Sequence, residues 1–118
     1  MPSIEKNIAA TPIIGSGYAN ISGKVLVNAA NGWDDYVMRL FEVQKGGHSG
    51  DHSHDFEHIV YVLEGQGTLR LGETIHPVEK GAFTVIPANI RHQLVNTSKS
   101  GEELKFICIV PKEGHSGF

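Results

Sequence analysis

Short runs of apolar residues, separated by glycine, proline and asparagine, recur along the chain and predict β-strands rather than helices. The run 36–44 alternates apolar and polar side chains, so successive residues fall on opposite faces of an extended strand. One of these faces carries Val37, Arg39, Phe41 and Val43. Arg39 is then the one charged residue on an otherwise apolar face.

The runs 59–63 and 104–110 are apolar on both faces, which is typical of strands that are buried on both sides. In a small barrel one such face lines the interior, and the other needs cover from outside the barrel. We therefore expect a homodimer that covers the outer apolar side chains. These are Ile59, Tyr61, Leu63, Ile107 and Ile109.

The remaining runs complete an all-β pattern with frequent turns. Further strands are expected over 23–28, 68–71, 74–78 and on either side of a proline turn within 81–96. Gly72 and Glu73 are expected to close a hairpin. We predict a small jelly-roll-like barrel of two antiparallel sheets, with no helix longer than a turn or two.

Length and charge set the class of protein. The chain has 118 residues, enough for one domain with a single core. We expect a single domain over 1–118, with an extended N-terminal arm over 1–20 and a C-terminal tail over 111–118. The net charge of −3 gives no basic surface for nucleic acid, and no apolar run is long enough to cross a membrane. Residues 1–6 lack the apolar stretch of a signal peptide, which favours the cytoplasm.

Histidines supply the candidate chemistry. His52 and His54 are two residues apart and leave the same face of an extended strand, and His58 begins the next apolar run. His92 follows a proline turn further along the chain. Imidazole is a common ligand of transition metals, so these four residues predict a metal site. The alternative is a surface loop that carries scattered histidines.

The spacing of these residues resembles the paired motifs of the cupin superfamily. The first motif, G(X)5HXH(X)3-4E(X)6G, is matched by Gly46, His52, His54, His58 and Gly65. The second motif, G(X)5PXG(X)2H(X)3N, is matched by Gly81, Pro87, Asn89, His92 and Asn96. The resemblance implies a cupin barrel with a bound metal.

Two positions depart from the cupin pattern. Asn89 replaces a glycine, and asparagine tolerates the left-handed backbone that glycine provides. His58 replaces the usual glutamate ligand, and Glu57 beside it is the alternative fourth ligand. Because adjacent strand residues point to opposite faces, we favour His58.

Four neutral imidazoles leave the charge of a divalent ion uncompensated, which raises its Lewis acidity and its attraction for anionic ligands. On a six-coordinate ion, four protein ligands leave two positions free. The chain further resembles small single-domain manganese cupins with four histidines. That resemblance implies one divalent ion per chain, manganese first and iron next, with nickel, copper or zinc as the remaining alternatives. It also implies oxidative cleavage of styrene-like double bonds with an activated peroxide.

We therefore expect a metal-dependent oxidoreductase that activates oxygen or peroxide against a small apolar or aromatic substrate. The expected cavity residues are Phe41, Val60, Phe106 and Cys108. Arg39 is the candidate catalytic residue that orients an anionic or carbonyl oxygen. Its alternative role is an arginine that reaches solvent or pairs with a carboxylate.

Two other functions are open to the same site. One is a non-redox lyase or isomerase of a small carbonyl compound or sugar acid, and the other is a small-molecule sensor without turnover. Three further histidines lie outside the motif spacing. His48 is expected in a solvated loop, His76 on the surface and His115 in a mobile tail.

Overall fold

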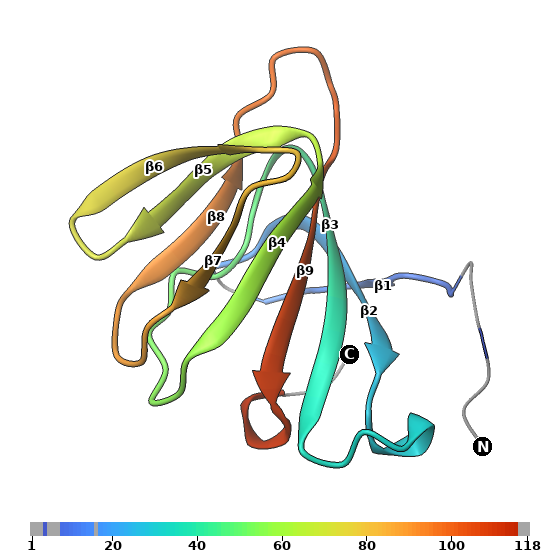
Figure 1. The fold of residues 1–118 in the computed structure, drawn as a ribbon. Helices are drawn as coiled ribbons and strands as arrows, with labels where there is room; N and C mark the ends of the chain where they lie inside the picture. Colours follow the sequence, from blue (N-terminus) through green and yellow to red (C-terminus); the bar gives the residue numbers. More distant parts are fainter. Residues whose placement is uncertain (1–3, 5–7, 16, 116–118) are drawn as a thin grey trace.

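The structure, a computed structural model, describes residues 4, 8–15 and 17–115 and is built almost entirely of strands (Figure 1). The predicted all-β fold is confirmed. Its strands are β1 (Thr11–Pro12), β2 (Ala19–Val27), β3 (Tyr36–His48), β4 (His58–Glu64), β5 (Gln66–Leu71), β6 (Thr74–Glu79), β7 (Phe83–Ile86), β8 (His92–Asn96) and β9 (Leu104–Pro111). Two 3-10 turns, η1 (Ala29–Asn31) and η2 (Lys112–Gly114), are the helical elements of the described residues. None of the described helices is long and apolar enough to cross a membrane.

The strands pair antiparallel in the order β6-β5-β8-β3-β9-β4-β7, and β2 joins β3 while β1 joins β2. The two expected sheets are the two halves of this single curled sheet, which forms a half-barrel in Figure 1. The halves are joined where the end of β3 meets β8, through the single pair His48 and Val95. His48 therefore lies at the end of a strand, half-buried, and the expectation of a solvated loop histidine is wrong.

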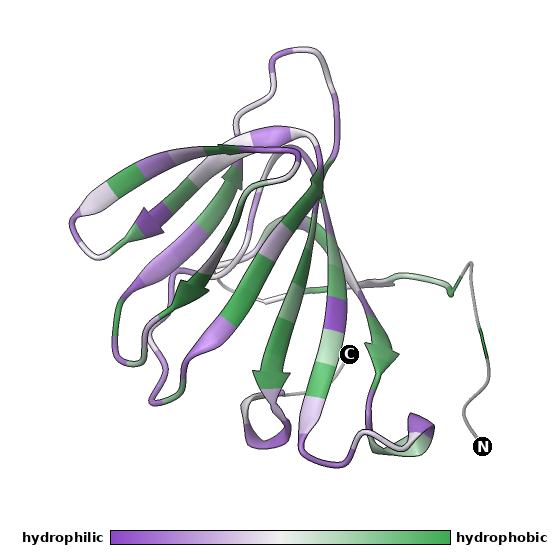
Figure 2. Cartoon of the chain, viewed as in Figure 1, coloured by the Kyte–Doolittle hydropathy of each residue, from purple (hydrophilic) through white to green (hydrophobic). Residues whose placement is uncertain are grey.

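The core lies on the concave side of the sheet. Side chains of β9 alternate between buried and half-buried along the whole strand, and β4 alternates between buried and exposed. Apolar residues run along β4, β7 and β9 in Figure 2, which matches the sequence pattern of these strands. The buried core comprises Ile21, Val37, Val43, Val60, Val62, Leu69, Ile86, Leu94, Leu104, Phe106, Cys108 and Val110.

Special backbone conformations hold the two histidine segments in place. Gly65 has φ +85°, and a Cβ there would lie 2.1 Å from the carbonyl oxygen of Glu103, so only glycine fits. Asn89 has φ +62°, the left-handed conformation expected of a residue that replaces glycine. The Asn89 N–H donates to the carbonyl of His54 at 2.5 Å, which ties the proline turn to the first histidine segment.

Both chain ends contact the barrel within the described residues. In the arm, β1 pairs with β2 of the same chain through Thr11–Gly23 and Pro12–Ser22. The half-buried His115 caps η2, and its expected place in a mobile tail stays a prediction. Other parts of the expected arm and tail, residues 1–3, 5–7, 16 and 116–118, lie outside the described residues.

Candidate metal centre

Backbone pairing brings the two histidine segments together. His52 and His92 face each other across an isolated antiparallel bridge, with N–H to carbonyl distances of 3.0 and 2.7 Å. His58 opens β4 and pairs with Ile86 at the end of β7, directly before the proline turn. The four candidate ligands thus come from β4, β8 and the loop between β3 and β4.

The rings of His54, His58 and His92 form a closed triangle. Their centroids are 5.8 Å apart for His54–His58, 5.0 Å for His54–His92 and 4.8 Å for His58–His92. The ring of His52 lies 5.4 Å from that of His54. An imidazole nitrogen bound at about 2.1 Å places its ring centroid about 3.2 Å from the ion, so neighbouring ligand rings are about 4.5 to 5.5 Å apart. Three of the four measured separations fall in this range, and the His54–His58 separation slightly exceeds it.

The donor atoms of these rings do not yet meet at one point. Among the described residues, no three histidine, cysteine, aspartate or glutamate side chains are grouped as they stand to hold a metal ion. The Nδ1 of His92 lies 3.0 Å from the carbonyl oxygen of Ile90, a contact that orients the ring. The Nδ1 of His58 is buried without a hydrogen-bond partner. The positions of the rings fit an ion, and rotation of the side chains has to bring the nitrogens together.

The protonation states also suit a metal. Burial, together with the smaller effects of the neighbouring His92, His54 and Arg39 in that order, lowers the pKa of His58 to about 3. Burial is likewise the main cause of the lowered pKa of His54 and of His92. These three imidazoles are therefore neutral at pH 7, the form that binds metals, so protons do not compete for the site.

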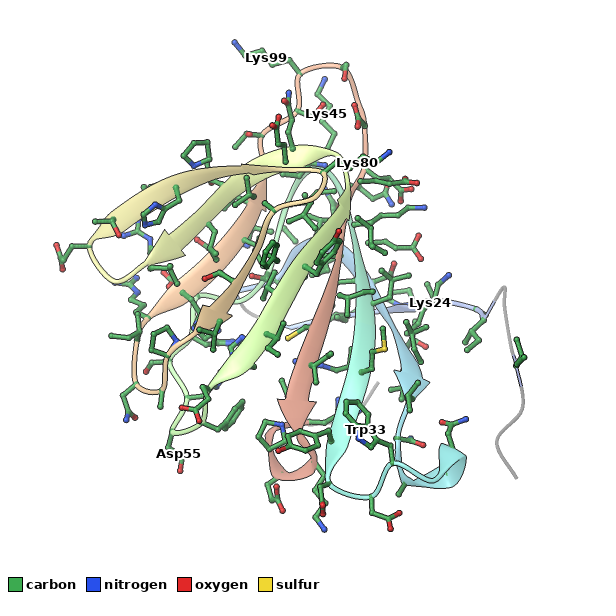
Figure 3. All side chains as sticks on the ribbon, viewed as in Figure 1. Lys24, Trp33, Lys45, Asp55, Lys80 and Lys99 are labelled. Carbon is green, nitrogen blue, oxygen red and sulfur yellow. The ribbon has the colours of Figure 1, made fainter. Side chains whose placement is uncertain are left out.

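Adjacent residues of the loop face opposite ways, as strand alternation predicts. His58 is 6% exposed and lines the cavity, whereas the neighbouring Glu57 is exposed. Asp55 is also exposed, and Figure 3 shows it at the tip of the loop before β4, pointing away from the barrel. Neither carboxylate lies on the cavity wall. Of the titratable residues from 52 to 58, only the histidines line the cavity.

A cavity of about 500 Å³ opens next to the histidines. Strand register explains its wall, because Arg39 pairs with Cys108 across β3 and β9, and Cys108 pairs with Val60 across β9 and β4. Two residues further along β3, Phe41 pairs with Phe106 of β9, and their rings stack with centroids 5.1 Å apart. The four expected cavity residues and Arg39 line it together with the four histidines.

Arg39 points into this cavity. Its Nη2 donates to the Sγ of Cys108 at 3.2 Å, and its guanidinium lies 5.0 Å from the centroid of the Phe41 ring. Its Nε is buried without a hydrogen-bond partner. No carboxylate belongs to the described cavity lining, so the charge of Arg39 is not neutralised there. The arrangement suits the binding of an anionic or carbonyl oxygen and differs from an arginine extended into solvent.

Cys108 is 3% exposed and belongs both to the core and to the cavity wall. Burial raises the pKa of its thiol, and the charge of Arg39 opposes this rise only in part. The thiol therefore stays protonated at neutral pH, which leaves it as an apolar wall residue with a weak acceptor for Arg39.

Sequence patterns missed several residues around the cavity. Tyr18 precedes β2 and lies on the cavity wall, and Phe56 stacks on His54 with centroids 4.8 Å apart. The pKa of His115 is lowered first by burial and then by the nearby charge of Arg39. These residues follow no alternation in the sequence, and the aromatic character of Tyr18 and Phe56 was the only signal that could have found them.

The cupin domain family matches residues 39–110, which include β4 to β8 and most of β3 and β9. The chain is a cupin. The match covers the histidine segments and the cavity wall described above, and it agrees with the half-barrel fold.

The chain is also similar in sequence to a curated protein. A 1-methylthio-D-xylulose 5-phosphate methylsulfurylase from Rhodospirillum rubrum is 34% identical over 76 residues, which are 64% of this chain and 47% of that protein. This cupin thus spans about half the length of that curated relative.

Solved structures of similar fold include enzymes. The polyketide cyclase RemF from Streptomyces resistomycificus is 26% identical, with a TM-score of 0.83 over 94% of this chain and 79% of that one. A cupin-2 domain protein from Rhodospirillum rubrum is also 26% identical, with a TM-score of 0.78 over 98% of this chain and 80% of that one. The homologues of this cupin thus include proteins named as enzymes.

Proposed function

We propose that this cupin is a metal-dependent oxidoreductase with one divalent transition ion at His52, His54, His58 and His92. Manganese is the first candidate and iron the second, because imidazole sites with open positions suit redox metals better than zinc. The observation that carries the proposal is the meeting of neutral histidines with one unneutralised guanidinium in a cavity that also presents aromatic and aliphatic side chains.

An ion held only by imidazoles supplies a strongly Lewis-acidic, redox-active centre for oxygen or peroxide. The protein's own residues hold and orient the substrate. Phe41 and Phe106 present stacked rings to an apolar or aromatic body, and Arg39 anchors an anionic or carbonyl oxygen. Phe56 on His54 shields the edge of the centre from water.

A non-redox function at carbonyl groups is the second candidate. The curated relative is named for a xylulose phosphate and the structural neighbour for a polyketide, and both classes of compound carry ketone groups. A metal-dependent lyase, isomerase or cyclase would use the same cation and cavity to stabilise an enolate oxygen.

One assay separates the two candidates. Manganese-, iron- and zinc-loaded protein would be offered styrene-like alkenes, enols and small diketones, with and without oxygen or peroxide. We expect the manganese or iron form to oxidise an alkene or enol, and the metal-free and zinc forms to leave it unchanged. Equal turnover of a diketone by zinc and manganese forms without oxidant would favour the second candidate. Tight binding without turnover would favour a sensor.

The same assay also tests the role of Arg39 in substrate binding. The variant Arg39→Gln removes the charge, and we expect it to raise KM about tenfold or more with a smaller effect on kcat, since a charged hydrogen bond is lost from substrate binding. Arg39→Lys is the matched control and should restore part of the affinity. Equal KM values for the wild type and Arg39→Gln would contradict the role of anchor.

A further inference from the structure

His52 differs from the other three histidines in what its ring contacts. Its Nε2 lies 3.4 Å from the hydroxyl of Tyr18, and the two rings meet edge-on with centroids 5.5 Å apart. Nε2 is one of the two ring nitrogens that can bind an ion. In the present arrangement it is engaged by Tyr18 instead.

The space that receives the His52 ring exists because residue 50 is glycine. A Cβ on Gly50 would lie 2.2 Å from Nε2 and 2.3 Å from Cε1 of His52. Gly50 is buried, and its φ lies outside the left-handed region where L side chains are strained. The backbone therefore does not demand glycine at this position, whereas the observed position of the His52 ring does.

The other three rings form the mutual triangle described above. The backbone of His52 pairs with that of His92, but the ring contacts given for His52 in the described part of the chain are with His54 and with Tyr18. The site thus divides into three histidines whose rings contact one another and a fourth, His52, whose ring has an alternative partner in Tyr18.

We propose that Tyr18 is a positioning residue that holds His52 over Gly50, and that His52 is an exchangeable fourth ligand. This inference rests on the proposed metal site. The inference refines the four-histidine site: with His52 held by Tyr18, an ion would be bound by His54, His58 and His92 and would keep one more position open. With His52 released, a fourth imidazole fills that position. Tyr18 precedes β2, so the N-terminal segment of the chain sets how many ligands the ion receives.

Two unrelated substitutions release His52, and this makes the inference testable. Tyr18→Phe removes the hydroxyl, and Gly50→Ala fills the space under the ring without removing a polar group. The steric conflict at Gly50 is with the end of a flexible side chain, so rotation of His52 relieves it. Tyr61→Phe on the outer face of β4 is the matched control for the loss of a tyrosine hydroxyl.

The protein would be loaded with copper, and the coordinated imidazoles counted by pulsed electron paramagnetic resonance. We expect three coupled imidazoles in the wild type and in Tyr61→Phe, and four in Tyr18→Phe and Gly50→Ala. Calorimetric titration with manganese should show affinity raised about 2- to 10-fold in both releasing variants, the value of one modest hydrogen bond. Circular dichroism and thermal melting would show that each variant is folded.

Two results would overturn the inference. If wild type and both variants bind the ion through the same number of imidazoles, Tyr18 does not position His52, although the metal site stands. If the wild type binds no ion at these histidines, the proposed function fails together with the role of Tyr18.

Discussion

His58 decides the charge of the candidate centre. A glutamate at this place would neutralise one unit of the charge of a divalent ion, whereas a neutral imidazole leaves that charge in full. The structure places the His58 ring beside those of His54 and His92 and leaves Glu57 exposed. The ligand that replaces the usual cupin glutamate is thus tested most simply by comparing the adjacent residues His58 and Glu57.

The first prediction concerns that comparison. His58→Ala should weaken manganese binding by at least about tenfold, because even outer-shell partners of ligands contribute that much to metal affinity. Glu57→Ala is the control and should bind as the wild type does in the same calorimetric titration. The reverse order of affinities would move the fourth ligand to Glu57.

A second prediction follows from the lowered pKa of His58 in the metal-free protein. The folded value of about 3 lies below the ordinary value of about 6.5, so the unfolded chain binds more protons between these pH values. The free energy of unfolding should therefore fall as the pH drops from about 6.5 toward 3. Urea denaturation at a series of pH values should show a shallower slope for His58→Leu. Identical slopes would mean that His58 is not buried as described.

Strand alternation and motif spacing predicted the side chains at the centre of the site, because those residues lie on strands with a period of two. The residues that close the site were not predictable in this way. Tyr18 reaches His52 across 34 positions in sequence, and Gly114 packs so tightly against Phe56 that a Cβ would lie 2.5 Å from its ring. Such contacts depend on the path of loops and chain ends, which carry no periodic pattern.

At the scale of elements, β3 links the two halves of the sheet. It spans 13 residues, of which Tyr36–Val43 pair with β9, while its far end pairs with β8. The sequence predicted this strand only to residue 44, because glycine at 46 and 47 is typical of a loop. Pairing with Ala19 on one side and Val95 on the other extends the strand through those glycines to His48.

Turns between strands depend on glycine to different degrees, and this gives a third prediction. Gly81→Ala places an L residue at φ +93° with open space around it, which should cost about 1 to 2 kcal/mol. Gly65→Ala has the same backbone strain plus a Cβ 2.1 Å from a backbone carbonyl that cannot rotate away. Thermal melting should therefore show a clearly larger loss for Gly65→Ala. Equal losses would contradict the close approach of Gly65 to Glu103.

At the scale of the whole molecule, the convex side of the sheet carries an outer patch made of Ile59, Tyr61, Phe83 and Val85. These side chains are 48%, 42%, 72% and 55% exposed, and the rings of Tyr61 and Phe83 stack with centroids 6.0 Å apart. The expected outer residues Leu63, Ile107 and Ile109 are half-buried within the chain. The outer patch therefore extends from β4 to β7, whose outer residues the sequence analysis did not include.

The fourth prediction is that this outer patch joins two copies of the chain as a homodimer. Sedimentation at micromolar concentration should give a dimer for the wild type and a monomer for the double variant Tyr61→Lys with Phe83→Lys. Ile75→Lys, at a 57% exposed position on β6 away from the patch, is the control and should remain dimeric. A monomeric wild type would refute the assembly.

The central claim is that the histidine cluster binds a redox metal, and direct metal analysis tests it. Protein purified without added chelator, with manganese, iron and zinc all supplied during growth, would be examined by elemental analysis and electron paramagnetic resonance. We predict about one manganese or iron ion per chain in the wild type, and its loss in His54→Ala with the fold retained. A wild type that holds only zinc, or a metal content unchanged in His54→Ala, would contradict the account.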